Sequence, residues 1–374
     1  MKYVSEFRDP RLAQQLAQAL AREARPDRLY RFMEFCGGHT HALARYGVLD
    51  LLPPQVRMIH GPGCPVCVLP IGRIDMAIEV ARRPGVTLAS YGDTLRLPAS
   101  KGLSLMSARA LGADVRVVYS VDDALQLARA LPEREVVFLA IGFETTTPPT
   151  AVAIQTARRE GLRNFSVLCN HVLTPAAMHA ILDQPEPVAL DGLVGPAHVS
   201  TIIGSRPYEV FASSYHLPVV IAGFEPLDVM QAILMLIRQV NEGRAEVENE
   251  FTRAVNREGN ARAIALTKEV FTLRDHFEWR GLGSMPYSAL RLHDRYADMD
   301  AEQRFGLATR VVPDHPRCEC GPILRGHKRP QDCVLFGTIC TPEHPTGACM
   351  VSSEGACAAH YRYGRHQALS RNTP

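Results

Sequence analysis

The chain has 374 residues, of which 46% are hydrophobic and 21% charged, an ordinary composition for a globular protein of two or three domains. Lys plus Arg number 41 and Asp plus Glu 39, so nothing indicates the clustered basic surface of a nucleic-acid-binding protein. Residues 1–27 predict a polar amphipathic helix rather than a signal peptide, and no apolar run approaches the roughly 18 residues of a membrane span. We therefore expect a cytoplasmic protein with no membrane and no nucleic-acid partner.

The chain contains ten cysteines. Cytosolic thiols are kept reduced, and a chain of this length can build a stable core without disulfide bonds. The cysteines therefore indicate metal or redox chemistry rather than a disulfide framework.

The first two thirds of the chain alternate between short apolar runs and helical patterns. The runs predict strands at Leu29–Phe35, Val56–His60, Val86–Ser90, Val115–Ser120, Val136–Ile141, Ser166–Cys169, Gly192–Val194 and Val219–Ala222. Helices are expected at Arg73–Arg83, Asp122–Ala130, Ala151–Arg159 and Pro226–Val240. This alternation predicts an α/β fold of parallel sheets with right-handed crossovers.

Three parts are expected along the chain. Pro132 marks a boundary between two α/β domains at residues 1–131 and 132–240. The charged, helix-prone segment 241–262 predicts a solvated helical connector. Beyond Val311, six cysteines among many Pro and Gly residues predict a small domain organised by a metal, so that residues 241–374 form the third part.

The segment CGGHTH at residues 36–41 directly follows a predicted strand. Its glycines put the Cys36 thiol on a tight turn, and a helix predicted over residues 40–46 aims its N-terminal amides at that turn. This arrangement favours the thiolate, the form that binds metals and acts as a nucleophile. His39 is a candidate ligand, proton acceptor or helix cap, and His41 is expected to be structural. The alternative for Cys36 is a small buried hydrophobe.

The segment GPGCPVC at residues 61–67 follows the next predicted strand. Cys64 and Cys67 have thioredoxin-like spacing, and a helix N-terminus beside them is expected to lower the pKa of one thiol. The pair can close a small disulfide or bind a soft metal. Half of a zinc site is the alternative, but no second half lies nearby in sequence. We favour a redox-active thiol pair.

The segment GFETTTP at residues 142–148 also follows a predicted strand. Its threonines can cap the next helix, and Glu144 is either part of that cap or a proton-transfer group. A similar Gly-Phe-Glu corner occurs at residues 223–225, by internal repetition or by chance. Both corners lie at strand C-termini, where open α/β sheets place their ligands.

The tail contains its cysteines at irregular intervals. Cys318, Cys333, Cys340 and Cys357 are separated by 14, 6 and 16 residues, unlike the paired CxxC spacing of zinc ribbons. Four loop-borne thiolates of this kind suit a [4Fe–4S] cluster, with zinc as the alternative. The sequence does not decide which four of the six are ligands, and the reserves are Cys320 and Cys349. Cys169, on a predicted strand, is expected in the core.

Together the four motifs resemble the HypD family of [NiFe]-hydrogenase maturation factors. The matching segments are CGGHTH, GPGCPVC, GFETTTP and the cysteine-rich tail at residues 318–361, in the same order and across nearly the whole chain. The resemblance implies two Rossmann-like α/β domains and a third domain with a [4Fe–4S] cluster.

The resemblance also implies a role and partners. The chain would be a scaffold on which a small HypC-type chaperone and a HypE-type cyanide donor help to build an Fe(CN)2(CO) unit, destined for the precursor of the hydrogenase large subunit. Cys36 would hold that iron, with a cysteine of the HypC-type partner as co-ligand. Cys64 and Cys67 would lie across the same cleft as a thiol pair, and electrons could come from the cluster. His39 and Glu144 would handle protons.

Two other interpretations use the same residues. A cluster-coupled thiol–disulfide oxidoreductase would need the Cys64–Cys67 pair and the tail but not Cys36. A zinc-stabilised α/β binding module would contain zinc and no inorganic sulfide.

Overall fold

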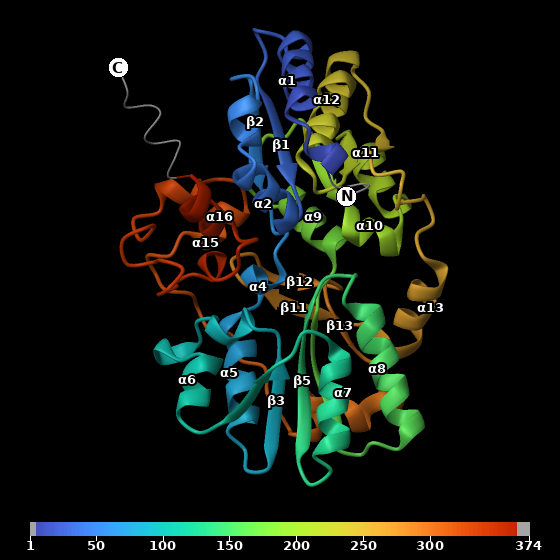
Figure 1. The fold of residues 1–374 in the computed structure, drawn as a ribbon, viewed down its shortest axis with the longest axis vertical. Coiled ribbons are helices and arrows are strands. Elements are labelled where there is room, and N and C mark those ends of the chain that lie inside the picture. The colour runs from blue at the N-terminus through green and yellow to red at the C-terminus, as the bar shows by residue number, and fades with distance from the viewer. Residues whose placement is uncertain (1–4, 365–374) are drawn as a thin grey trace.

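The structure, a computed structural model, describes residues 5–364 (Figure 1). Figure 1 shows an α/β lobe at each end of the long axis and a third lobe, with α15 and α16, on one side between them. We call the first two the five-stranded lobe and the four-stranded lobe, after their sheets, and residues 311–364 the cysteine lobe. The predicted α/β class with a cysteine-rich C-terminal region is confirmed.

The five-stranded sheet is entirely parallel and has the strand order β2-β1-β7-β8-β9. Its strands are β1 (Tyr30–Glu34), β2 (Val56–His60), β7 (Gly192–Pro196), β8 (Val219–Ala222) and β9 (Val247–Asn249). The chain first adds β2 on one side of β1 and later adds β7 on the other. The carboxyl ends of β1 and β7 therefore form the switch point at which doubly wound sheets bind ligands.

The four-stranded sheet is also entirely parallel, and its strand order β4-β3-β5-β6 likewise reverses direction once. Its strands are β3 (Val86–Ser90), β4 (Asp114–Val117), β5 (Glu135–Gly142) and β6 (Phe165–His171). The switch point lies between β3 and β5. All eight predicted strands are confirmed, with ends that differ by three residues or fewer.

The two sheets do not follow the expected division at Pro132. The chain contributes β1 and β2 to one sheet, builds the whole of the other with β3 to β6, and then returns with β7 to β9. Pro132 lies in the short turn between α7 and β5, inside the four-stranded lobe. There it prevents continuation of a helix and does not separate two folding units.

Helices cover both faces of each sheet, as the apolar runs predict. Phe32 packs with α1 and α12, whereas its neighbour Met33 packs with α9 and α11 on the opposite face. The helices of the five-stranded lobe are α1 (Pro10–Glu23), α2 (Gly37–Arg45), α3 (Val48–Leu51), α9 (Thr174–Leu182), α10 (Ala197–Ile203), α11 (Glu209–Tyr215) and α12 (Pro226–Glu242). Those around the four-stranded sheet are α5 (Ile71–Ala81), α6 (Leu105–Ala110), α7 (Val121–Ala130) and α8 (Thr147–Glu160), and the short α4 (Pro65–Val68) lies between the lobes. The N-terminal helix predicted over 1–27 is thus α1, preceded by a 3-10 turn at Ser5–Arg8, and its residues 1–4 lie outside the described range.

The predicted helical connector over residues 241–262 is wrong. Helix α12 ends at Gly243, which has the left-handed φ of 67° that favours glycine at a helix C-terminus. The chain then adds β9 to the sheet edge, and α13 (Ala261–Val270) begins only after Asn260 caps it. Charge and helix propensity did not reveal that β8 had an open edge for Val247 to pair with.

The remaining elements join the lobes. Two antiparallel pairs follow: β11 (His276–Trp279) and β12 (Gly283–Pro286) form a hairpin, and β10 (Phe271–Leu273) pairs with β13 (Leu290–Leu292) on either side of it in the chain. They are followed by α14 (Ala301–Arg304), and the cysteine lobe contains α15 (Cys320–Leu324) and α16 (Ala356–Tyr363). Further 3-10 turns lie at Thr94–Arg96, Ser100–Gly102, Arg206–Tyr208, Asp294–Met299, Pro330–Asp332 and Ala348–Met350. Within residues 5–364, every helix is too short or too polar to cross a bilayer.

Candidate functional site

The switch points of the two sheets meet at one cavity of about 280 Å³. His198 reaches it from the end of β7, Asp93 follows β3, and Thr145 and Thr146 follow β5. The cysteine lobe contributes Glu354. The other lining residues are Gly63, Pro65, Val66, Tyr91, Ile141, Gly142 and Phe143. We call this space the interlobe cavity; all four sequence motifs border it or contact a residue that does.

Cys36 is the N-cap of α2, directly after β1. Its Sγ accepts a hydrogen bond from the Gly38 amide at 3.3 Å and lies 3.4 Å from Nδ1 of His198. The side chain is 1% exposed. A soft thiol is thus held beside an imidazole that lines the interlobe cavity.

The expected thiolate at Cys36 is corrected by the structure. The helix N-terminus is present, but burial raises the pKa of the Cys36 thiol well above its ordinary value, and the nearby carboxylates of Glu354 and Glu34 raise it further. Burial also lowers the pKa of His198 to about 4, with a smaller contribution from His39. The pair is therefore a neutral thiol beside a neutral imidazole, and deprotonation of Cys36 needs a cation to compensate the charge.

The Gly-Pro-Gly turn packs directly on Cys36. Gly63 accepts a hydrogen bond from the Gly37 amide at 3.0 Å, and a β-carbon at Gly63 would lie 2.2 Å from the Cys36 backbone nitrogen. Only glycine allows this approach. The turn leads into α4, where Cys64 and Cys67 form a disulfide with a Cα–Cα distance of 5.2 Å. The sequence prediction that this pair can close a small disulfide is thus confirmed.

His39 is completely buried behind Cys36. Its Nε2 hydrogen-bonds to the carbonyl oxygens of Ala222 and Gly223 at 3.0 and 3.1 Å, and Nδ1 has no partner among residues 5–364. The ring packs against Phe224, which also packs against His198. Burial lowers the pKa of His39, so a neutral ring anchors α2 to the end of β8.

His41 points away from Cys36. Its Nδ1 lies 3.3 Å from the Ser353 carbonyl oxygen, and the ring meets Tyr363 edge-on. It therefore joins α2 to the cysteine lobe, a structural role as expected.

Glu144 is not brought to Cys36. Its carboxylate accepts hydrogen bonds from the backbone amide and hydroxyl of Thr174, at 2.8 and 3.0 Å, at the start of α9. It lines a separate, largely apolar cavity of about 660 Å³. Burial raises the pKa of Glu144 to about 7. The two Gly-Phe-Glu corners are also not equivalent, because they follow β5, the third strand of its sheet along the chain, and β8, the fourth of the other.

Sequence reasoning missed His198, Asp93 and Glu354. His198 could have been found, because it lies two residues after the end of β7, a predicted strand whose carboxyl end belongs to a switch point. Burial raises the pKa values of Asp93 and Glu354, so the cavity holds two carboxyls that retain protons more readily than usual. Glu354 lies in a loop of the tail, and no local sequence pattern there indicates a site residue.

The tail cysteines gather in the cysteine lobe. The Cys320 thiol contacts the thiols of Cys318, Cys349 and Cys357, and Cys340 lies close enough to influence Cys357. Hydrogen bonding from Cys320 lowers the pKa of Cys318 to about 7, which makes a thiolate accessible. Cys333 lies partly exposed on the loop before Cys340. The structure brings together two of the four expected ligands and both reserves, so the ligand set stays a prediction.

Gly347 shows how closely the backbone surrounds these thiols. A β-carbon there would lie 2.5 Å from Sγ of Cys320 and 2.7 Å from Sγ of Cys318. Cys320, Cys340, Cys349 and Cys357 are buried in an apolar cluster. Soft donors in an apolar shell fit an iron–sulfur cluster. Across residues 5–364 no three His, Cys, Asp or Glu side chains already stand in a metal-binding geometry. Cys169, by contrast, is a core residue as predicted, and its thiol donates a hydrogen bond to the Leu290 carbonyl oxygen.

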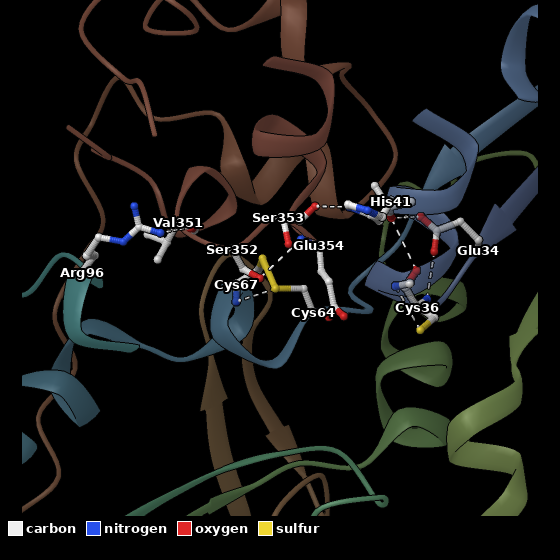
Figure 2. Close-up of a disulfide and its surroundings, with 12 residues drawn as sticks. Glu34, Cys36, His41, Cys64, Cys67, Arg96, Val351, Ser352, Ser353 and Glu354 are labelled. Atoms are coloured by element: carbon white, nitrogen blue, oxygen red, sulfur yellow. Dashed lines mark hydrogen bonds between the residues drawn. A yellow bond between two sulfur atoms is a disulfide. The ribbon is translucent and has the colours of Figure 1, made fainter. Parts of the chain in front are cut away.

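The cysteine lobe reaches the disulfide directly. Figure 2 shows the Ser352–Glu354 segment beside Cys64 and Cys67, with Cys36 further along. A β-carbon at Gly355 would lie 3.0 Å from Sγ of Cys67 and 2.3 Å from the carbonyl oxygen of Cys349. The disulfide therefore lies between the tail cysteines and the interlobe cavity.

Comparison with known proteins gives concordant matches over nearly the whole chain. A sequence model of the HypD family, described as "Hydrogenase formation hypA family", matches residues 11–364. The chain is 65% identical over 370 residues to the hydrogenase maturation factor HypD of Cupriavidus necator, covering 98% of both chains. It is 64% identical to HypD of Azotobacter vinelandii over 98% of both chains, and 45% identical to HypD of Escherichia coli K12 over 98% of this chain and 99% of that one.

Proposed function

Because the chain belongs to the HypD family, we propose that it is a hydrogenase maturation factor and the scaffold on which the Fe(CN)2(CO) unit of a [NiFe]-hydrogenase is assembled. One observation carries the proposal: Cys36 contacts His198, which lines the interlobe cavity, and the Cys64–Cys67 disulfide brackets Pro65 and Val66, which also line it. The iron unit is the cargo of this site and is not a resident cofactor.

Cys36 is the proposed iron ligand. A thiolate is a soft donor suited to low-spin iron, and the positive charge of iron would offset the burial that keeps the thiol protonated in its absence. A cysteine of a small HypC-type partner would be the co-ligand. Because the thiolate is the form that is readily oxidised, the high pKa of free Cys36 would protect it from oxidation until iron binds.

The lining of the interlobe cavity suits cyanide and carbonyl ligands. The cavity is small, and Thr145 and Thr146 bring hydroxyls to it just before the N-terminus of α8. Such a helix end favours the partial negative charge of bound cyanide. Asp93 and Glu354, with raised pKa values, can donate protons there. Glu144 and His39, which the sequence suggested for proton transfer, are placed instead to cap α9 and to anchor α2.

The tail would pass reducing equivalents to the disulfide, and the Cys64 and Cys67 thiols formed in this way could give two electrons and two protons to the site as the disulfide re-forms. The tail cysteines, with Cys318, Cys333, Cys340 and Cys357 as the expected set, would hold a [4Fe–4S] cluster, which supplies single electrons when bound. Opening the Cys64–Cys67 bond consumes two electrons and two protons, and the electrons would come from a one-electron donor protein outside this chain. The contact of Gly355 with both Cys67 and Cys349 supports this route. A HypE-type protein would bring cyanide, and the large-subunit precursor would receive the finished unit.

The test is an infrared spectrum of the protein purified without oxygen from cells that also express its HypC-type and HypE-type partners. Carbonyl and cyanide bands that disappear in Cys36→Ala, while iron–sulfur content is retained, are expected. If protein that carries its cluster and its small partner shows no such bands, the cluster-coupled thiol–disulfide oxidoreductase becomes the better account, since the disulfide is present in either case.

A further inference from the structure

A line of buried side chains connects the Cys36 turn to the cysteine lobe. Glu34, at the end of β1, is completely buried and accepts a hydrogen bond from the Cys36 amide at 2.8 Å. Nδ1 of His60, at the end of β2, lies 2.8 Å from the other oxygen of the same carboxylate. Nε2 of His60 in turn lies 2.9 Å from Nε2 of His360 on α16.

The outer partner determines the direction of these hydrogen bonds. Burial lowers the pKa of His360 to about 3, with contributions from His60 and Arg329, so His360 is neutral. The Gln331 amide nitrogen donates to Nδ1 of His360 at 2.9 Å, which leaves the single ring proton of His360 on Nε2. His360 therefore donates to His60, and His60 donates from Nδ1 to Glu34. Every hydrogen bond in the line points toward Glu34.

Glu34 needs these donors. A buried carboxylate is costly unless hydrogen bonds compensate it, and here the donors are the Cys36 amide, the Thr40 hydroxyl and His60. Two of the three belong to the turn and helix that hold Cys36. If His60 is lost, the carboxylate loses the one donor from outside the β1–α2 corner, and this corner loses its link to α16.

The far end of the line lies among the proposed cluster ligands. His360 is on the same short helix as Cys357, and that helix packs against α2. A shift of α16 is therefore transmitted to Cys36 by hydrogen bonds as well as by packing. The line opens beside a cavity of about 1000 Å³, lined by His60, Gln331 and His360, so its outer members can rearrange without disrupting the core.

We propose that His60 is a positioning residue for Cys36, acting through Glu34, and that His360 couples this positioning to the cysteine lobe. The inference gains its meaning from the proposed function, in which Cys36 holds iron while the tail holds the cluster. It assigns a role to two histidines, His60 and His360, that the sequence analysis did not single out.

The experiment follows alkylation of Cys36 by iodoacetamide at one fixed pH, quantified by mass spectrometry of the Cys36 peptide. It uses the full-length, cluster-loaded protein with iron and sulfide measured for each variant. In His60→Ala, Cys36 is expected to be alkylated about tenfold faster. Losing one hydrogen bond to a buried carboxylate should increase the population of open conformations of the Cys36 turn by about a factor of ten. His60→Asn keeps a donor at the Nδ1 position but lacks the contact with His360, so it is expected to reduce the increase to about threefold.

His360→Phe tests the coupling. It removes the donor to His60 and keeps a ring of similar size, and it is expected to increase the rate about threefold, within the usual range of one lost neutral hydrogen bond. Because His60→Asn already breaks the link, adding His360→Phe to it should change the rate no further. The matched control is His179→Phe, which removes the 2.9 Å contact of His179 with the Tyr215 hydroxyl elsewhere in the lobe and should leave Cys36 unaffected.

Equal rates in His60→Ala, His60→Asn and wild type would overturn the positioning role, and additive effects of His60→Asn and His360→Phe would overturn the coupling. If His60→Ala does not fold, the comparison of wild type, His60→Asn and His360→Phe still decides the matter. The readout needs no assembled iron unit. Absence of infrared bands would therefore count against the proposed function alone, and unchanged alkylation against this inference alone.

Discussion

The side chain of Glu354 lies against the backbone of Gly37, one residue after Cys36. The two are separated by more than 300 positions in the chain, yet the carboxylate raises the pKa of the Cys36 thiol, second only to burial. Glu354 also lines the interlobe cavity beside His198. The cysteine lobe thus supplies charge to the site as well as thiols.

Replacing Glu354 by Gln should lower the pKa of Cys36. Removal of one nearby negative charge is expected to move the pH midpoint of Cys36 alkylation down by about half to one pH unit, and so to increase the rate at pH 8 up to about tenfold. Alkylation of the Cys36 peptide across a pH series measures this. Glu343→Gln, an exposed change in the same lobe, is the control. An unchanged or raised midpoint would contradict the assignment.

Glu144→Gln should alter how stability depends on pH. The folded-state pKa of Glu144 is raised to about 7 from 4.5, so between these values the unfolded state releases its proton first and the wild type loses stability as pH rises. The neutral variant has no such loss. Its free energy of unfolding relative to wild type should therefore increase by about 3 kcal/mol between pH 4.5 and pH 8. Denaturant titrations at the two pH values measure the change, and a constant difference would show that folding does not raise the pKa of Glu144.

Three buried histidines should make the fold sensitive to acid. Burial lowers the pKa values of His171 and His198 to about 4 and that of His360 to about 3. Each contributes stability that is complete above pH 6.5 and is lost as pH falls toward 4, because the unfolded state takes up protons first. Between pH 6.5 and pH 4 each accounts for about 3 kcal/mol, and the loss from His360 continues to about pH 3. The melting temperature should fall steeply across this window, and His171→Gln should reduce the slope.

Under the proposed function, in which the tail holds a [4Fe–4S] cluster, Gly347→Ala should cause loss of the cluster and leave the α/β lobes folded. An alanine β-carbon would overlap the sulfurs of Cys320 and Cys318, so these thiols must move apart. Iron and sulfide content should fall by about half or more, with an unchanged far-UV circular dichroism spectrum. Gly92→Ala, where the nearest atom is at an ordinary contact distance of 3.5 Å, should retain both. Full iron content in Gly347→Ala would show that these thiols are not ligands.

The disulfide makes a prediction about thiol labelling. When air-oxidised protein is unfolded in iodoacetamide without reductant, eight of its ten cysteines should be labelled, with Cys64 and Cys67 protected. Prior reduction should expose both, and Cys64→Ser should expose Cys67 without reduction. Labelling of Cys67 in the unreduced wild type would mean that the pair is held as thiols.

Much of the fold could be predicted from the sequence because its strands are short apolar runs buried on both faces. Val56–His60, Val86–Ser90 and Val219–Ala222 were predicted to the residue. The predicted position of the motifs at strand ends is also confirmed: CGGHTH and GPGCPVC follow the neighbouring strands β1 and β2 of one sheet, and GFETTTP follows β5 of the other. The neutral state of Cys36 was not predictable, because it depends on complete burial in the folded chain and on the carboxylate of Glu354, more than 300 positions away, as well as on that of Glu34.

The order of strands within a sheet could not be predicted in this way. Phe32 of β1 has Met58 on one side and Gly192 on the other, and nothing local in either segment selects the second pairing. The same holds for His360, which meets His60 across 300 residues. Such pairings are long-range packing choices, and they decided both where the domains divide and what surrounds Cys36.

The return of the chain to its first sheet has a consequence for synthesis on the ribosome. Strands β1 and β2 emerge first, but their neighbour β7 is more than 130 residues behind them, whereas β3 to β6 follow one another and can pair as soon as they appear. The lobe that begins second is therefore the first that can be completed. Until β7 arrives, β1 has an open edge and Cys36 lacks its His198 neighbour, so a nascent chain stalled before that point would expose the thiol that the finished fold conceals.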